Sequence, residues 1–386
     1  MITIQKHKFA SLQKIYIFAL LCCFTLLYNG KKNTDREQIQ KIETPEDAVL
    51  TFRKHLYQNK IDSIFKKYEF NGSIAVYQDS TLLASGNKGF LNFKTKTLVS
   101  DSTIYAIGSV SKQFTAAMIL LLEEQQKLKI DDKVSQYLED FSTPEKKNIT
   151  IHQLMNHTSG INDFGNGLYF TPGTNFNYTN KGYYYLGQII EKTSGRSYRQ
   201  NAKALFLKAG MKNTSTADDV HPKNFASAFT GNSKNAQEVA NMPKRLSEKN
   251  ISNAAGGILS TVSDLHRWNQ LLYNGKILNQ ESFQKFISKN IDREHPIFGK
   301  MGYASGIMIF PGIPKSYFHS GYVKGSPSLN VYYPGTRTSL IILSNIADET
   351  KGKNAFFKPH LEMKAATDQI ETANAQTSSK IKHEEK

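Results

Sequence analysis

A serine and a lysine stand three residues apart in the segment 108–116, at Ser109 and Lys112. On a helix this spacing puts both side chains on one face, so the hydroxyl and the amine can meet. A serine hydroxyl is a weak nucleophile at neutral pH and needs a neighbouring base. A lysine can be that base when it is desolvated and held neutral. The pair therefore has the composition of an activated nucleophile.

The spacing by itself is common in this lysine-rich chain. It recurs at Ser11, Ser63, Ser85 and Ser282. The surroundings of Ser109 differ, because residues 102–108 have the pattern of an extended segment and residues 115–124 that of an apolar helix. A nucleophile at a helix N-terminus gains from the helix dipole and from free backbone N–H groups. The alternative is that Ser109 caps a core helix and has no catalytic role.

Composition favours a folded chain and argues against nucleic acid as a partner. The 386 residues include 39% hydrophobic side chains, enough for one large domain or two ordinary ones. The formal net charge is +16, but the lysines are scattered and no zinc finger, RNP or basic-helix pattern accompanies them. We expect solvated surface charge that suits an anionic cell envelope.

The N-terminus has the order of an export signal. Lys6, Lys8 and Lys14 precede an apolar run over residues 15–28. This run is short for a membrane-spanning helix of about 20 residues, and no small-x-small cleavage site precedes Lys31. A cleaved signal, a lipid anchor and a retained membrane anchor all stay open. We expect export to the periplasm or cell envelope, with any membrane contact made by residues 15–28.

Other hydrolytic chemistries fit the sequence less well. Cys22 and Cys23 both lie in the N-terminal segment, so the rest of the chain can form no disulfide, thiolate metal site or cysteine nucleophile. His152 and His157 are five residues apart without a His-Glu-x-x-His pattern, which does not put both on one helical face. No Gly-x-Ser-x-Gly elbow of an α/β-hydrolase is present. We expect no metal and no cofactor.

The chain divides into four parts by pattern. We expect a signal peptide or membrane anchor over residues 1–30, then a linker and an amphipathic helix over 31–67, with Thr44 as the helix cap. The globular domain spans 68–360. Residues 361–386 are polar and poor in aromatics, which is typical of a disordered tail.

Strand patterns lie near both ends of the globular domain. They cover residues 72–78, 82–85, 89–93, 305–310, 317–320, 328–333 and 338–343. Residues 150–210 are mainly helical, with breaks at 158–160, 172–173 and 194–195. Strands from both ends with helices inserted between them predict one antiparallel sheet plus a helical region, an α+β architecture.

Two further groups could complete a nucleophilic site. Tyr178 and Asn180 stand in a loop before a helix, where a phenol could pass protons and an amide could bind a carbonyl. His319 and Gly321 end a strand, and the missing side chain at Gly321 would let a substrate lie along the strand edge. The structural alternatives are a core tyrosine, a capping asparagine and a turn glycine.

Six short motifs occur in an order that resembles a known family. They are residues 108–112, 154–160, 178–180, 207–214, 255–265 and 319–321. Together they resemble the serine hydrolases of the class C β-lactamase and penicillin-binding-protein superfamily, over roughly residues 68–348. The resemblance implies a β-lactamase/transpeptidase-like fold, with an antiparallel sheet flanked by helices, an all-helical subdomain and an active site between the two.

The resemblance also implies roles for the candidate residues. Ser109 corresponds to the acylated nucleophile and Lys112 to the amine that helps remove its proton. Tyr178 corresponds to the second general acid/base, and Asn180 to an amide that orients the substrate. The oxyanion hole corresponds to the backbone N–H groups of Ser109 and Tyr322.

The chain departs from the β-lactamase pattern at His319, where those enzymes usually carry lysine. Histidine is mostly neutral near pH 7 and cannot hold a carboxylate as a permanent cation. The departure resembles the esterase, D-amino-acid peptidase and penicillin-binding-like branches. It implies a serine hydrolase that forms an acyl-enzyme on a small-molecule or peptide substrate of ester, D-amino-acyl or β-lactam type, related to peptidoglycan, with β-lactamase activity less favoured. The alternatives are that His319 is a bystander and that the protein is a non-catalytic, envelope-anchored penicillin-binding-like protein.

Overall fold

The computed structural model describes residues 44–219, 223–240 and 252–384. The expected signal or anchor and the linker up to residue 43 lie outside the described residues. The described residues between 53 and 372 form one unit, which holds every described strand, and residues 44–52 together with 373–384 belong to a second. None of the described helices is long and apolar enough to cross a membrane.

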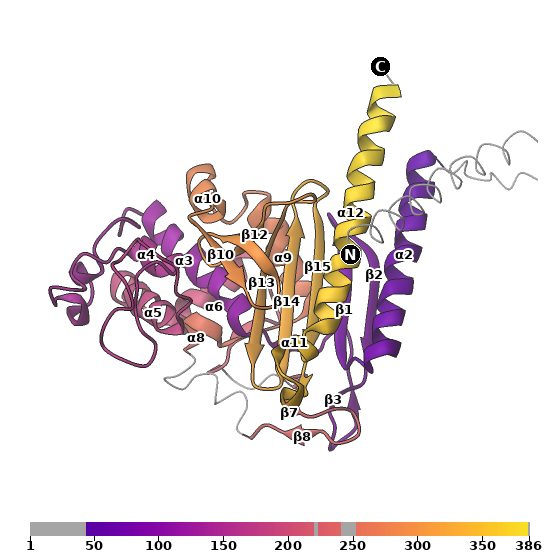
Figure 1. The fold of residues 1–386 in the computed structure, drawn as a ribbon, viewed down its shortest axis with the longest axis horizontal. Helices are drawn as coiled ribbons and strands as arrows, with labels where there is room; N and C mark the ends of the chain where they lie inside the picture. The colour runs from indigo at the N-terminus through magenta and orange to yellow at the C-terminus, as the bar shows by residue number, and fades with distance from the viewer. Residues whose placement is uncertain (1–43, 220–222, 241–251, 385–386) are drawn as a thin grey trace, which may run out of the picture. The chain divides into compact units, whose positions relative to one another are not determined.

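The helices and strands alternate in blocks along the chain (Figure 1). The helices are α2 (Pro45–Tyr68), α3 (Lys112–Glu124), α4 (Ile151–Met155), α5 (Asn180–Ser194), α6 (Tyr198–Lys208), α8 (Asn253–Gly256), α9 (Val262–Tyr273), α10 (Gln280–Ile287), α11 (Lys353–Phe356) and α12 (Lys358–Glu384). Short 3₁₀ turns are η1 (Gly108–Ser111), η2 (Val134–Gln136), η3 (Glu139–Phe141) and η4 (Glu349–Lys351).

The main sheet has eight strands in the order β10-β11-β12-β13-β14-β15-β1-β2. They are β1 (Gly72–Gln78), β2 (Thr81–Lys88), β10 (Ile291–His295), β11 (Gly299–Tyr303), β12 (Met308–Phe310), β13 (Ser316–Val323), β14 (Ser326–Tyr333) and β15 (Thr338–Ser344). Smaller sheets use β3 (Phe90–Asn92), β4 (Thr97–Leu98), β5 (Tyr105–Ala106), β6 (Ser215–Thr216), β7 (Phe229–Thr230), β8 (Gln237–Glu238), β9 (Ile258–Ser260) and β16 (Ile346–Ala347).

Pairing between β1 and β15 joins the two ends of the domain. The antiparallel register runs from Gly72 opposite Ser344 to Gln78 opposite Thr338. The antiparallel sheet built from both ends of the sequence is therefore confirmed. Strands β10 and β11 were not predicted, because charged residues interrupt the apolar pattern there.

Helices cover both faces of this sheet. On β15, the Thr338 hydroxyl donates to Glu371 of α12 (2.9 Å), while the next residue, Ser339, accepts from Asn269 of α9 (3.3 Å). Successive strand residues point to opposite faces. Helix α9 therefore packs on one face of the sheet and α12 on the other. Helix α2 lies on the same face as α12, where its side chains contact Gly86 of β2.

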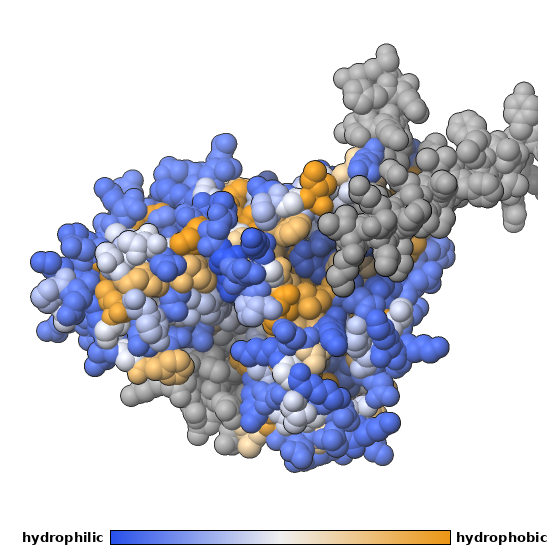
Figure 2. Space-filling view, in the orientation of Figure 1, coloured by the Kyte–Doolittle hydropathy of each residue, from blue (hydrophilic) through white to orange (hydrophobic). Residues whose placement is uncertain are grey.

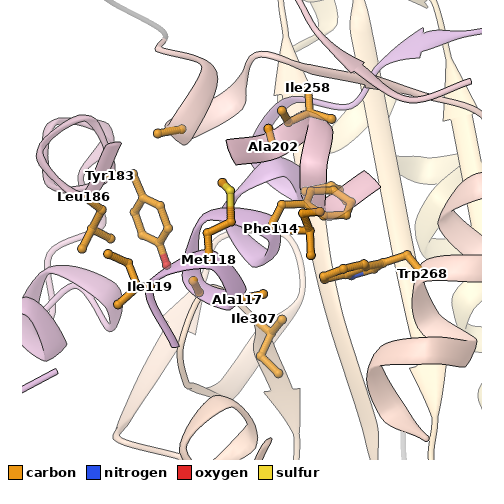
Figure 3. Close-up of a cluster of buried hydrophobic side chains, with 14 of the residues drawn as sticks. Phe114, Ala117, Met118, Ile119, Tyr183, Leu186, Ala202, Ile258, Trp268 and Ile307 are labelled. Carbon is orange, nitrogen blue, oxygen red and sulfur yellow. The ribbon is translucent and has the colours of Figure 1, made fainter. Parts of the chain in front are cut away.

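The core is built around α3. Its residues 112–120 are all buried, and Phe114, Ala117 and Met118 lie between Trp268 of α9 on one side and Tyr183 of α5 on the other (Figure 3). The Trp268 indole N–H donates to the side chain of Gln113 in α3 (2.7 Å). A helix that is enclosed on all sides has a fixed position. The turn that leads into it, which carries Ser109, is fixed in consequence.

The disordered tail expected over residues 361–386 is not what the structure shows. Helix α12 continues through this region, and Glu371 is fully buried. Its carboxylate accepts hydrogen bonds from Arg53 (2.8 Å), Tyr57 and Thr338. A buried carboxylate with this many donors is stabilised although the segment has few apolar residues, so polarity was a poor guide to disorder here.

The visible surface of the described residues is mostly hydrophilic (Figure 2). The large exposed apolar side chains are spread over several helices, strands and loops: Leu82, Leu98, Phe164, Tyr169, Tyr184, Leu207 and Ile313. Such single exposed residues are normal for a folded domain.

Candidate active site

Ser109 lies in the 3₁₀ turn η1, one turn before the buried helix α3. Its Oγ is 3.1 Å from the Nζ of Lys112, the first residue of α3. The N-cap positions of η1 and α3 are Ile107 and Ser111, so the alternative in which Ser109 caps the helix does not hold. The predicted serine–lysine pair is in direct contact.

Lys112 is completely buried and makes three polar contacts through Nζ. Besides Ser109, these are to Asn180 Oδ1 (2.8 Å) and to the backbone oxygen of Ala255 (2.7 Å). Burial lowers the pKa of Lys112 from 10.5 to about 7, and the Asp163 carboxylate acts in the opposite direction. The amine is therefore neutral in a large share of molecules at neutral pH.

The start of α5 brings Tyr178 and Asn180 to this pair. Thr179 is the N-cap of α5, and its hydroxyl accepts from Gly182 N–H (3.3 Å). The Asp163 carboxylate accepts from the Thr179 hydroxyl and from the backbone N–H groups of Asn180 (3.3 Å) and Lys181 (2.9 Å). An acidic side chain at a helix N-terminus is favourable. Asp163, which the sequence did not single out, thus fixes the segment that carries both candidates.

The Tyr178 ring lies beside Lys112, with Nζ 4.8 Å from the ring centroid. Its Oη is buried without a hydrogen-bond partner among the described residues. Burial raises the pKa of Tyr178, and the Ser109 hydroxyl and the Arg293 cation oppose that rise. At neutral pH the phenol is protonated and can donate a proton.

Two glycines let the turn η1, which carries Ser109, lie against β13. A Cβ on Gly321 would come within 2.0 Å of the Ile107 carbonyl oxygen, and a Cβ on Gly108 within 2.6 Å of Tyr322 N. Gly108 also has φ +51°, a conformation that side chains disfavour. The missing side chain of Gly321 therefore makes room for the turn at Ile107. Ser109 and the backbone of Tyr322 are close as a result. The role of Gly321 in making room for substrate stays a prediction.

One edge of β13 is free next to this turn. Pairing with β12 runs from Ser316, opposite Phe310, to Phe318, opposite Met308. Beyond Phe318, β13 pairs on its other side with β14 and has no partner from β12 among the described strands. An extended ligand can pair with such an edge.

His319 ends a chain of hydrogen bonds that runs through the site. The Thr179 N–H donates to His157 Nδ1 (3.3 Å), which places the His157 proton on Nε2. His157 Nε2 then donates to Tyr303 Oη (3.1 Å), Tyr303 donates to His319 Nε2 (3.0 Å), and His319 Nδ1 donates to the Ser320 oxygen (2.6 Å). In this series of hydrogen bonds each donor has one acceptor, and the imidazoles of His157 and His319 are both neutral.

Electrostatics support the neutral state of both histidines. Burial, followed by the Lys112 charge, lowers the pKa of His157 and of His319 well below its ordinary value. Both nitrogens of His157 are used within the chain of hydrogen bonds. Among the described residues no group of three or more His, Cys, Asp or Glu side chains is arranged to hold a metal ion.

Arg293 and Tyr303 were missed by the sequence analysis. The guanidinium carbon of Arg293, on β10, lies 4.7 Å from the Phe176 ring centroid, 5.5 Å from that of Tyr178 and 5.8 Å from that of Tyr303. Neither residue belongs to a recognised motif, and the charged β10 has no strand pattern. The sequence carried no signal for them.

The sequence matches the family described as Beta-lactamase over residues 59–357. It is 29% identical over 342 residues to penicillin-binding protein 4* of Bacillus subtilis, covering 79% of this chain and 74% of that protein. It is 28% identical over 324 residues to the teichoic acid D-alanine hydrolase of Staphylococcus aureus, covering 78% of this chain and 74% of that protein.

The fold agrees with a solved structure of this family. The penicillin-binding protein from Bacillus halodurans superposes with a TM-score of 0.68 at 22% identity, covering 80% of this chain and 98% of that one. The predicted fold, with an antiparallel sheet and a helical region, is confirmed. The chain belongs to the β-lactamase family, as the match over most of its length shows.

Proposed function

We propose that this protein is a serine hydrolase that forms an acyl-enzyme on Ser109. The observation that carries the proposal is the contact between Ser109 Oγ and the buried Nζ of Lys112 at 3.1 Å. In the proposed reaction the hydroxyl attacks an ester or amide carbonyl, the leaving group departs, and water releases the acyl group.

The contacts of Lys112 support its role as the base. Asn180 Oδ1 and the Ala255 carbonyl can only accept hydrogen bonds, so they take two N–H groups. A neutral amine then has its lone pair left for the hydroxyl proton of Ser109. With a pKa of about 7, Lys112 is available in this form at neutral pH.

Tyr178 is suited to deliver a proton to the leaving group. Because burial raises its pKa, the phenol is protonated when the tetrahedral intermediate collapses. The Ser109 hydroxyl lies near enough to the phenol to oppose the rise in its pKa, so once the phenol has given its proton to the leaving group it can be reprotonated from the nucleophile side of the site. Asn180, which already binds Lys112, is suited to orient the substrate.

The proposed oxyanion hole consists of the backbone N–H groups of Ser109 and Tyr322. Its support is the close approach of the two segments, since a Cβ on Gly108 would touch Tyr322 N. The Tyr322 side chain is anchored as well, by its hydroxyl on Glu349 and by stacking on Phe356 at 4.7 Å. Loss of one such donor typically slows acyl transfer by about 100-fold to 1000-fold.

We propose an ester or D-amino-acyl amide of the cell envelope as the substrate class. A neutral His319 lacks the charge that favours β-lactam carboxylates. One relative is named a teichoic acid D-alanine hydrolase, which supports substrates bearing D-alanine. The export signal expected at the N-terminus suits such a location.

Intact mass after reaction with a fluorophosphonate tests the nucleophile. We expect one adduct on the wild type and none on Ser109→Ala. Ser63→Ala is a matched control, because Ser63 has the same spacing to Lys66 on the exposed side of α2. Turnover of a p-nitrophenyl ester, a D-alanyl peptide and a penicillin is measured in parallel.

Two outcomes would contradict the proposal. An unmodified wild type that turns over none of these substrates would favour a non-catalytic penicillin-binding-like protein. An adduct that persists in Ser109→Ala would mean that another residue is the nucleophile.

A further inference from the structure

Arg293 is a cation in the site without a hydrogen-bonding partner for two of its nitrogens. Nε and Nη1 are buried and have no acceptor among the described residues. The rings of Phe176, Tyr178 and Tyr303 surround the guanidinium and offset part of the cost through cation–π contacts. Ring faces leave the N–H groups without the oxygen acceptor that they prefer.

The carboxylates around Arg293 are engaged elsewhere. Asp292 and Glu294 flank it on β10 and point to the opposite side of the strand, where Asp292 binds Lys289 at 3.0 Å. Asp163 is occupied by the start of α5. No described carboxylate lies within 4 Å of Arg293, so its charge is unpaired.

Arg293 and Lys112 contact the same aromatic ring. Tyr178 contacts Lys112 at 4.8 Å from its centroid and Arg293 at 5.5 Å. His319, in contrast, uses both imidazole nitrogens in neutral hydrogen bonds to Tyr303 and to the Ser320 oxygen. A permanent positive charge at this edge of the site thus comes from β10 and not from β13.

We propose that Arg293 recognises an oxyanion, a carboxylate or a phosphate, that the substrate carries next to the scissile ester or amide. The inference rests on the hydrolase function proposed above. Arg293 is half-buried, so a group entering the site can reach its outer nitrogen, Nη2. The planar guanidinium fork binds carboxylate and phosphate oxygens in pairs, so an anion bound at Nη2 can place its second oxygen on Nη1, one of the two nitrogens without an acceptor.

Two matched pairs of substrates test this with the full chain. The carboxylate pair is N-acetyl-D-alanyl-D-alanine and its C-terminal carboxamide. The phosphate pair is the D-alanyl ester of glycerol 1-phosphate and that of glycerol. We expect kcat/KM of the wild type to favour the anionic member of at least one pair by about 10-fold to 100-fold, the usual size of a charge-assisted hydrogen bond. The pair that shows the preference identifies the source of the anion.

Variants assign the preference to Arg293. Arg293→Gln is expected to abolish it, and Arg293→Lys to retain part of it. Lys300→Gln is the matched control, because Lys300 is an exposed cation on β11 that lies opposite Glu294 in the register of β10 and β11. Its preference should equal that of the wild type. Each comparison is a ratio within one protein sample, so partial misfolding of a variant cancels.

The result that overturns the inference is a wild type without preference in either pair, or an Arg293→Gln variant that keeps the wild-type preference. If Arg293→Gln does not fold, a wild type without preference still overturns the inference, and Arg293→Lys decides the assignment: a reduced preference supports it and an unchanged one overturns it. Fluorophosphonate labelling of the same sample separates the two proposals. Labelled Ser109 without an anion preference rejects Arg293 recognition and leaves the hydrolase, whereas absence of both labelling and turnover rejects both.

Discussion

Replacing Lys112 by methionine tests the electrostatics of the site through protein stability. Burial lowers the lysine pKa from 10.5 to about 7, so the folded protein binds this proton more weakly than the unfolded chain does. At about 1.4 kcal/mol for each pH unit, the difference is about 5 kcal/mol. This destabilisation is fully present below pH 7. It decreases between pH 7 and 10.5, where the unfolded state holds more protons, so stability rises with pH.

Methionine has a similar length and no charge, and it removes the pH-dependent destabilisation. It also leaves Asn180 Oδ1 and the Ala255 oxygen without their donor, at a cost of about 1–3 kcal/mol each. The two effects offset each other near pH 7, where we expect free energies of unfolding within about 3 kcal/mol. From pH 7 to pH 9 the wild type should gain about 2 kcal/mol relative to Lys112→Met.

Urea unfolding at pH 7, 8 and 9 measures this change. Trp268, the single tryptophan, is buried against α3 and reports the transition by fluorescence. Lys127→Met, at an exposed lysine, controls for the loss of a surface charge. If the difference between wild type and Lys112→Met is the same at all three pH values, the lowered lysine pKa is refuted. The variant should also be unreactive toward the fluorophosphonate.

Three further predictions concern the same site. The rate of Ser109 acylation by a neutral ester should rise about tenfold per pH unit below pH 7 and level off above it. An acylation rate that does not change between pH 5.5 and pH 8 would argue against a lysine base. Tyr303→Phe leaves the His157 Nε2 donor and the His319 Nε2 acceptor without a partner and should lower the free energy of unfolding by about 2–5 kcal/mol in urea titrations. An unchanged urea midpoint would contradict the series of hydrogen bonds from His157 to His319. Gly108→Ala puts a Cβ within 2.6 Å of Tyr322 N and should slow esterase turnover at least about 100-fold, whereas wild-type turnover would mean that this approach is not needed.

The parts of the fold that the sequence predicted are those with local apolar patterns. Residues 72–78 and 338–343 form strands β1 and β15, because continuous apolar runs mark strands buried on both faces. The C-terminal helix was missed because its burial depends on a distant partner. Glu371 binds Arg53, and no local pattern reports a contact over that separation.

The candidate site, too, contains residues that a local pattern predicts and residues that depend on distant parts of the chain. Ser109 and Lys112 were identified from spacing within one helical turn, which is a local property. Tyr178, Asn180 and His319 required a resemblance, since each has an ordinary structural role in isolation. Arg293 could not be predicted, because its importance comes from neighbours on other elements and from the carboxylates that it lacks.

The neutral state of His319 is linked to the position of the cation Arg293. The Lys112 charge disfavours a positive charge on His319, since like charges lower the pKa of lysine and histidine alike. A lysine at 319 would therefore push the pKa of Lys112 further down or be forced neutral itself. Arg293 stays protonated at neutral pH and lies beside the ring of Tyr178, where its charge lowers the phenol pKa. With the permanent charge on β10, the lysine pKa lies near 7, as the proposed base requires, and a cation remains for the proposed recognition of an anionic substrate.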